Sequence, residues 1–213
     1  MITMLAAAGM AFSLIASPLA VADTPAVPEA PDKVTVDVVT VNGSGCPPGT
    51  TAVAVNWDNT AFTVTYSDYL AQVGVGAKPT DVRKNCQLAL RVNYPQGFTY
   101  AIQKADYRGY ANLQAGAAGI QRANYYFQGN SGNSWKTHRF NGPYADNWQA
   151  TDTAEGPELV YAPCGETRNL NVNTELRVQV GSSNPSTTTS FMTMDSTDGS
   201  IRTTYHFSWK RCP

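Results

Sequence analysis

The sequence predicts an all-β protein: a two-sheet antiparallel sandwich, jelly-roll-like, that is stapled by two disulfides. Three observations lead to this fold class. Many short runs alternate apolar and polar residues, turn-forming residues separate these runs, and the number of cysteines is even. Helical periodicity is weak. Only residues 67–77 (SDYLAQVGVGA) suggest a short helical stretch, which Gly74 and Gly76 would interrupt.

Alternation predicts strands in the first half of the chain at 33–41, 51–57, 61–70 and 86–94. In 51–57, one face is expected to carry Val53, Val55 and Trp57. In the next two strands the expected inward sets are Phe62, Val64 and Tyr66, and then Leu88, Leu90 and Val92. Residues 58–60 (DNT) separate two of these strands and predict a hairpin turn.

A second hairpin is predicted near the end of the chain, between 187–195 and 200–210. Asp198-Gly199 is a favoured pair for a tight turn between two strands. Alternation after this turn places five residues on one face of the last strand: Ile201, Thr203, Tyr205, Phe207 and Trp209.

The N-terminal segment predicts secretion. Residues 5–16 are apolar, and Ala20-Val21-Ala22 forms an A-x-A cleavage site, so residues 1–22 are interpreted as a signal peptide cleaved near Ala22. The apolar run is too short to span a membrane. A mobile Pro-rich spacer is expected at 23–33, and residues 34–213 are expected to form a single domain. The predicted localisation is secreted and extracellular.

The charge pattern argues against two classes of partner. Lys and Arg number 15 against 16 Asp and Glu, and no block of like charges occurs along the sequence. Binders of nucleic acid and of anionic membranes usually carry a basic stretch. We therefore expect neither a nucleic-acid partner nor binding to an anionic membrane surface. We expect no membrane span because the apolar run at residues 5–16 is too short.

The cysteines are Cys46, Cys86, Cys164 and Cys212, and in a secreted chain they predict two disulfides. Three pairings are possible. Loop closure weakly favours the two sequential pairs, Cys46–Cys86 and Cys164–Cys212. A metal site would need C-x-x-C spacing or nearby histidines, and the sequence has neither, so we expect no metal and no cofactor.

Six motifs resemble one family of secreted bacterial and fungal proteins, the domain-of-unknown-function 4360 family. The resemblance extends from about Val36 to Cys212, and it implies a secreted β domain with disulfides. It carries no catalytic residues over. The motifs are GSGCPPGT, RKNCQLALRVNYPQGF, RGYANL, FNGP, APCGETRNLNVNTELRV and WKRC.

Signals for catalysis are sparse. The chain has two histidines, His138 and His206, and no G-x-S-x-G elbow. Acidic residues gather near Trp148 and could serve a polymer hydrolase in a cleft near 133–158, although a solvated acidic loop explains them as well. These acidic residues are Asp146, Asp152, Glu155 and Glu158.

A binding role is better supported by residues 133–152, which set aromatic residues among Gly, Pro and Asn. Aromatic rings give apolar contact to sugar rings while neighbouring polar groups bond hydroxyls, so Trp135, Tyr144 and Trp148 are the candidate ligand residues. The alternative is that these rings belong to the core. The sequence thus favours a secreted non-catalytic binding or structural protein, with cell-wall or extracellular polysaccharide as the candidate partner. The extracellular hydrolase is the second hypothesis.

Overall fold

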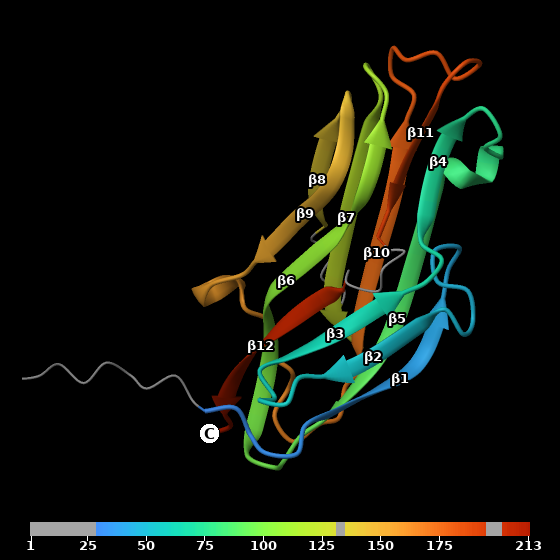
Figure 1. Ribbon diagram of the computed structural model, residues 1–213. Helices are drawn as coiled ribbons and strands as arrows, with labels where there is room; N and C mark the ends of the chain where they lie inside the picture. The colour runs from blue at the N-terminus through green and yellow to red at the C-terminus, as the bar shows by residue number, and fades with distance from the viewer. Residues whose placement is uncertain (1–28, 131–134, 195–201) are drawn as a thin grey trace, which may run out of the picture.

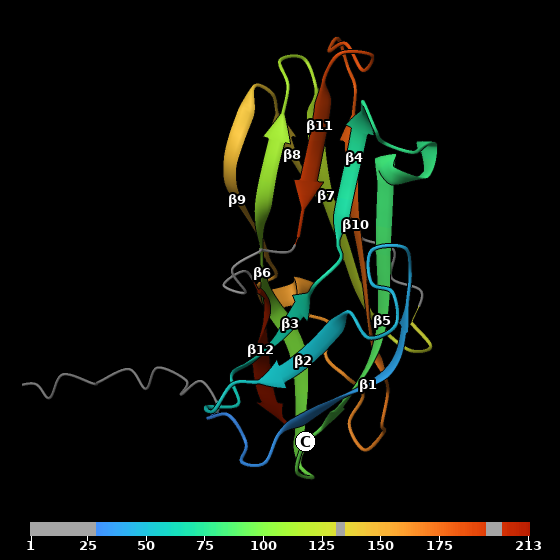
Figure 2. The same ribbon diagram turned by 45° about the vertical axis from the view of Figure 1, so that its right-hand side comes forward.

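The computed structural model describes residues 29–130, 135–194 and 202–213, and it shows two antiparallel β-sheets packed face to face (Figures 1 and 2). One sheet has five strands in the order β1-β5-β10-β7-β8, and the other has the order β2-β3-β12-β6-β11-β4, with β9 pairing β6. The predicted fold class is therefore confirmed. The signal peptide lies outside the described residues.

The five-stranded sheet is built from long, regular pairings. Its members are β1 (Thr35–Asn42), β5 (Arg83–Asn93), β10 (Leu170–Gln179), β7 (Ala118–Phe127) and β8 (Lys136–Asn141). Alternate residues of each central strand are buried, as in the pattern of β10, because one face of the sheet covers the core and the other faces solvent.

The second sheet is organised around its longest strand, β6 (Phe98–Leu113). Near one end of β6 lie β2, β3 and β12, and near the other end lie β4, β9 and β11 (Figure 1). Two short 3-10 helices, Pro79–Val82 and Gly156–Glu158, complete the ordered elements. The bounds of the remaining strands are Thr51–Val55 for β2, Ala61–Tyr66 for β3, Leu70–Gly74 for β4, Tyr144–Thr153 for β9, Thr189–Thr193 for β11 and Thr203–Arg211 for β12.

The hairpin predicted between the last two strands is wrong. Strand β11 pairs with Ala111 and Asn112 of β6, and β12 pairs with Phe98 to Asp106 of the same strand. Both run antiparallel to β6, so they point in the same direction instead of folding back on each other. Asp198-Gly199 lies outside the described residues.

The other local predictions had mixed outcomes. The hairpin of β2 and β3 is confirmed, and β4 replaces the helical stretch expected within 67–77 because it pairs with β11. At the end of the expected spacer, Pro31 is buried and its carbonyl accepts a hydrogen bond from Asn59 Nδ2, while residues 23–28 of the spacer lie outside the described residues.

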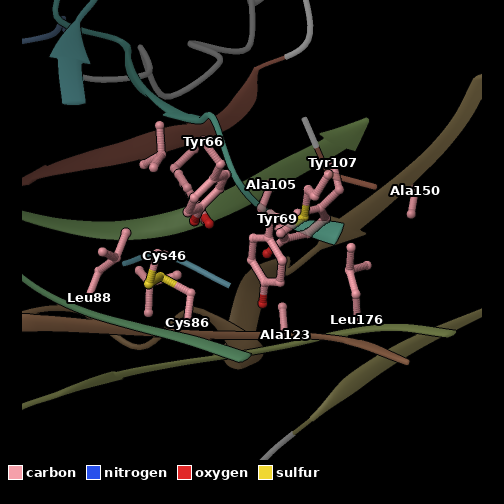
Figure 3. Packing of buried hydrophobic residues seen from close by; sticks show 14 of the residues in the cluster. Cys46, Tyr66, Tyr69, Cys86, Leu88, Ala105, Tyr107, Ala123, Ala150 and Leu176 are labelled. Atoms are coloured by element: carbon pink, nitrogen blue, oxygen red, sulfur yellow. A yellow bond between two sulfur atoms is a disulfide. The ribbon is translucent and has the colours of Figure 1, made fainter. Parts of the chain in front are cut away.

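The core lies between the sheets and is rich in aromatic rings. Both predicted inward sets of β3 and β5 are buried, as are Thr203, Tyr205, Phe207 and Trp209 of β12. Figure 3 shows the disulfide Cys46–Cys86 inside this cluster, close to Leu88. The second disulfide joins Cys164 to Cys212, so the two sequential pairs are confirmed.

Candidate binding surface and cleft

The three predicted ligand residues lie in different environments. Trp148 is 2% exposed and packs over Gly109 of β6, where a Cβ atom would come within 2.6 Å of the indole ring. Its Nε1 donates a hydrogen bond to the carbonyl of Thr193. Trp148 is therefore a core residue, and it has no free ring face to offer a ligand.

Tyr144 lies at the start of β9, beside the turn that contains the cis peptide Gly142–Pro143. Its hydroxyl donates to the carbonyl of Asn147, and its ring packs edge-on against Phe140 at 6.1 Å between centroids. The polar group of Tyr144 thus already has a partner within its own strand. Burial of the ring raises the pKa of its phenol, and the Asp146 carboxylate adds to the rise.

Trp135 directly precedes β8 and is exposed. It keeps 37% of its surface accessible, and the guanidinium of Arg122 lies 4.7 Å from its ring centroid. A cation–π contact of this kind fixes the orientation of the ring. Because exposed residues alternate with half-buried ones in β8, Trp135 points to the outer face of the five-stranded sheet, together with Thr137 and Arg139.

This outer face carries a row of amide side chains. Asn173 of β10 is in register with Gln87 of β5 on one side and with Asn124 of β7 on the other, and Gln87 is in turn in register with Asn42. Residues in register on neighbouring strands lie about 5 Å apart and point to the same face. Asn124 is only 1% exposed, so Asn42, Gln87 and Asn173 are the members of the row that are at least partly exposed. Amides both donate and accept hydrogen bonds, which suits these three to the hydroxyls of a sugar.

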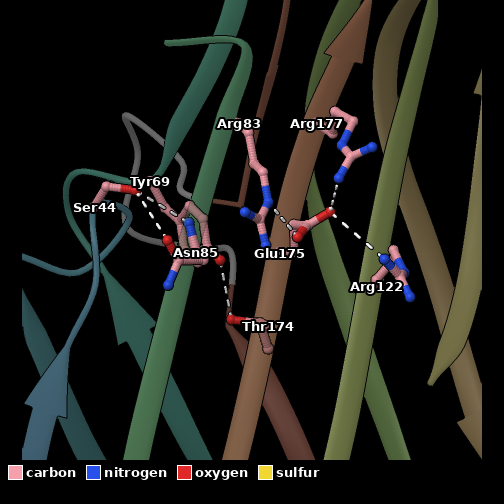
Figure 4. A network of polar contacts seen from close by, with 8 residues as sticks. All are labelled: Ser44, Tyr69, Arg83, Asn85, Arg122, Thr174, Glu175 and Arg177. Atoms are coloured by element: carbon pink, nitrogen blue, oxygen red, sulfur yellow. Dashed lines mark hydrogen bonds and ion pairs between the residues drawn. The ribbon is translucent and has the colours of Figure 1, made fainter. Parts of the chain in front are cut away.

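A charged cluster lies next to the amide row. Glu175 of β10 is only 2% exposed, and three arginines surround it (Figure 4). Its carboxylate is 2.5 Å from Nε of Arg83, 3.1 Å from Arg177 and 3.9 Å from Arg122. A carboxylate this deeply buried needs such partners, since an unpaired charge would be costly. Glu175 consequently holds the three guanidiniums in place on the face.

A pocket of about 480 Å³ opens where β8 ends its pairing with β7, within the region predicted for a cleft. Lys136 and Glu158 lie in its wall, with their charged groups 3.8 Å apart. The rest of the wall is mainly apolar. It includes Ile102, Tyr125, Tyr126, Phe127, Ala154, Pro157, Val160 and Leu170.

A chain of hydrogen bonds runs behind this pocket and joins the two sheets. The hydroxyl of Tyr125 donates to Asp152 Oδ2 at 2.6 Å, and Nε2 of His138 lies 2.7 Å from Asp152 Oδ1. Tyr107 contacts the hydroxyl of Tyr125. Burial raises the pKa of Asp152, and the hydrogen bond with His138 offsets only part of the rise.

Two of the acidic residues near Trp148, Asp146 and Asp152, do not converge as a pair of catalytic carboxylates would. Asp146 and Asp152 are six residues apart on the extended strand β9, which separates them by roughly 20 Å. The second histidine, His206, lies elsewhere, 3.0 Å from Asp106 on the outer face of the other sheet. No group of three or more metal-ligating side chains occurs among the described residues.

Sequence patterns missed the arginine cluster because its members come from separate strands. Arg83, Arg122 and Arg177 are scattered along the chain, and only the strand order β5-β10-β7 brings them together. The alternation within each strand could place each arginine on the outer face, but the cluster also depends on pairings between distant segments. The formal net charge of the chain is only -1, so the overall charge gave no indication of a basic face.

Together, these features define a disulfide-linked β-sandwich domain with one open, polar and basic sheet face. A family model described as "domain of unknown function (DUF4360)" matches residues 32–212, so the chain belongs to this family and the resemblance seen in the cysteine motifs is confirmed. An uncharacterized secreted protein of Arthroderma benhamiae is similar, with 36% identity over 182 residues, which are 85% of this chain and 73% of that protein.

The comparisons agree with the chemistry of the fold. Disulfides persist in oxidising compartments, and a secreted relative shares most of the domain, which together indicate an extracellular protein. In the part of the chain that the structure describes, no helix has the length and apolar character needed to cross a membrane.

Proposed function

We propose that this protein is a secreted, non-catalytic domain that binds polysaccharide through the outer face of its five-stranded sheet. The observation that carries the proposal is the exposed ring of Trp135, held by Arg122 beside the amide row. A flat sugar ring can stack on an indole while its hydroxyls bond neighbouring amides and guanidiniums. Of the predicted ligand residues, Trp135 is the one that this proposal uses. Trp148 is excluded because its ring is buried.

The test is retention of the secreted protein on insoluble cell-wall and extracellular polysaccharides. Trp135→Ala should lose most of the retention on the polymer that binds the wild type. Trp57→Ala is the matched control, because Trp57 is 95% exposed but belongs to the β2–β3 turn of the other sheet. Equal retention of wild type and Trp135→Ala on every polymer, or a loss that Trp57→Ala shares, would refute the proposed surface.

The second candidate function is an extracellular polymer hydrolase that uses the pocket beside β7. What favours it is the His138–Asp152 pair behind that pocket, with an aspartate whose pKa is raised by burial. Raised carboxyl pKa values are common in general acids. Release of new reducing ends from a polymer, abolished by His138→Gln, would support this function over simple binding.

A further inference from the structure

Four arginines meet on the outer face of the five-stranded sheet. Arg83, Arg177 and Arg139 fall in a single register row that crosses β5, β10, β7 and β8, with Ile120 occupying the β7 position. Arg122 lies in the next row, opposite Glu175. The folded chain therefore concentrates positive charge on a sheet face that adjoins the amide row and Trp135.

The positive charge on this face exceeds the negative charge beside it. Glu175 is the carboxylate that contacts Arg83, Arg122 and Arg177, while the partners of Arg139 among the described residues are the amide oxygens of Asn141 and Gln179. Three guanidiniums thus share one carboxylate, and the fourth has no carboxylate partner among the described residues. Two like charges in register on neighbouring strands also repel each other, as Arg83 and Arg177 do, and Glu175 relieves this repulsion only in part.

The guanidiniums remain accessible to a ligand although their carboxylate does not. The side chains of Arg83, Arg122 and Arg177 are 56%, 33% and 39% exposed, whereas that of Glu175 is 2% exposed. Each guanidinium has five N–H donors, and its planar fork matches the two oxygens of a carboxylate or a sulfate. Glu175 orients the arginines from below, and solvent-facing donors are left over above it.

We propose that the polysaccharide bound by this face is acidic, with its carboxylate or sulfate groups contacting the arginine row and its hydroxyls contacting the amide row. This inference rests on the proposed function. An acidic polysaccharide fits better than nucleic acid because the basic region is confined to part of one sheet and the whole chain carries a formal net charge of -1.

The experiment measures binding of the secreted protein to soluble polymers by affinity electrophoresis, in native gels cast with each polymer at low and at high salt. The acidic polymers are polygalacturonate and a sulfated galactan, and the neutral ones are a β-glucan and a galactomannan. Gels with duplex DNA, and flotation with vesicles of phosphatidylserine and phosphatidylcholine, test the other anionic partners.

The variants separate charge from folding. Arg139→Gln and Arg122→Gln should each weaken binding to an acidic polymer about twofold to fivefold, the range expected for one exposed ion pair. Glu175→Gln removes the negative charge but keeps an amide oxygen that can still accept from the guanidiniums, so it should strengthen this binding. Arg108→Gln is the matched control, since Arg108 is an exposed arginine on β6 of the other sheet. Circular dichroism and urea unfolding check that each variant is folded.

The outcomes are distinct for the two proposals. Binding to an acidic polymer that weakens with salt and follows the order of the variants supports both. Binding to a neutral polymer alone, unaffected by Arg139→Gln, overturns the acidic ligand and leaves the proposed function standing. Retention by no polysaccharide overturns both, and binding only to DNA or to vesicles assigns the arginine row to a different anion.

Discussion

His138 of β8 and Asp152 of β9 join the two sheets of the sandwich through a hydrogen bond of 2.7 Å between Nε2 and Oδ1. Asp152 is 6% exposed, and its second oxygen accepts the hydroxyl of Tyr125 from the opposite sheet. A buried carboxylate thus lies at the seam between the sheets, and its protonation is coupled to folding.

The stability of the protein should depend on pH through Asp152. Burial raises its pKa in the folded state above the ordinary value of 3.8, so between the two values the folded state binds more protons than the unfolded chain. Its contribution to the free energy of unfolding is therefore present below 3.8 and is lost as the pH rises through the folded pKa. Urea unfolding of wild type and Asp152→Asn should show the wild type gaining relative stability as the pH falls.

The same comparison in a His138→Gln background isolates the aspartate, because His138 contacts Asp152 directly. The gain in stability at low pH of the chain with Asp152 over the Asp152→Asn variant should persist in the His138→Gln background. A stability difference that is constant with pH, or that grows as the pH rises, would contradict the assignment.

Buried tyrosines should resist ionisation at alkaline pH. Burial raises the pKa of Tyr66 to about 12, and it also raises those of Tyr69, Tyr107 and Tyr205. The folded state keeps these protons where the unfolded chain releases them, so stability should fall as the pH rises above about 10. Absorbance at 295 nm should show only part of the eleven tyrosines ionising before the sheet signal in circular dichroism is lost. Ionisation of all eleven tyrosines while the protein is still folded would contradict this prediction.

The two disulfides should differ in their resistance to reduction. Cys46 and Cys86 are 0% and 1% exposed, whereas Cys164 is exposed and Cys212 partly so. Thiolate exchange requires access to a sulfur atom, so mild reductant should open Cys164–Cys212 first. Alkylation followed by peptide mass spectrometry measures the order. In urea the two bonds should become similarly reactive, and a native-state order led by Cys46–Cys86 would be the opposite of this expectation.

The tryptophans should divide into core and surface residues. Trp148→Ala should lower the free energy of unfolding by about 3–5 kcal/mol, because it leaves a cavity over Gly109. Trp57→Ala should change it by no more than about 0.5 kcal/mol, since that ring is 95% exposed. Urea denaturation measures both values, and a small effect of Trp148→Ala would place its ring outside the core.

Local alternation in the sequence was enough to predict the class of fold, the buried sets of β3 and β5, and the β2–β3 hairpin. It misplaced Trp57, which was expected beside Val53 and Val55, because β2 ends at Val55 and the chain turns before the tryptophan. It also could not show that β11 and β12 lie one after the other along β6, since strand order depends on pairings between distant segments.

The candidate site was predictable only in part, for the same reason. A loop rich in aromatic residues drew attention to Trp135, but the sequence around Trp148 gave no sign that Gly109, on another strand, would receive its ring. The arginine row needs four strands in register before it exists at all. Residues 133–134 of the predicted binding segment lie outside the described residues.

The most direct test of the central claim, that the outer face of the five-stranded sheet binds glycans, is a titration followed by the indole N–H signals in an NMR spectrum of ¹⁵N-labelled protein. The chain has four tryptophans. The indoles of Trp148 and Trp209 are bonded to carbonyls inside the molecule, and Trp57 belongs to the other sheet. Oligogalacturonate and a neutral β-glucan oligosaccharide are each added in turn. We predict that at least one of them moves the Trp135 signal and leaves the other three in place. Shifts confined to the other three signals, or no shift with either sugar at millimolar concentration, would contradict the account.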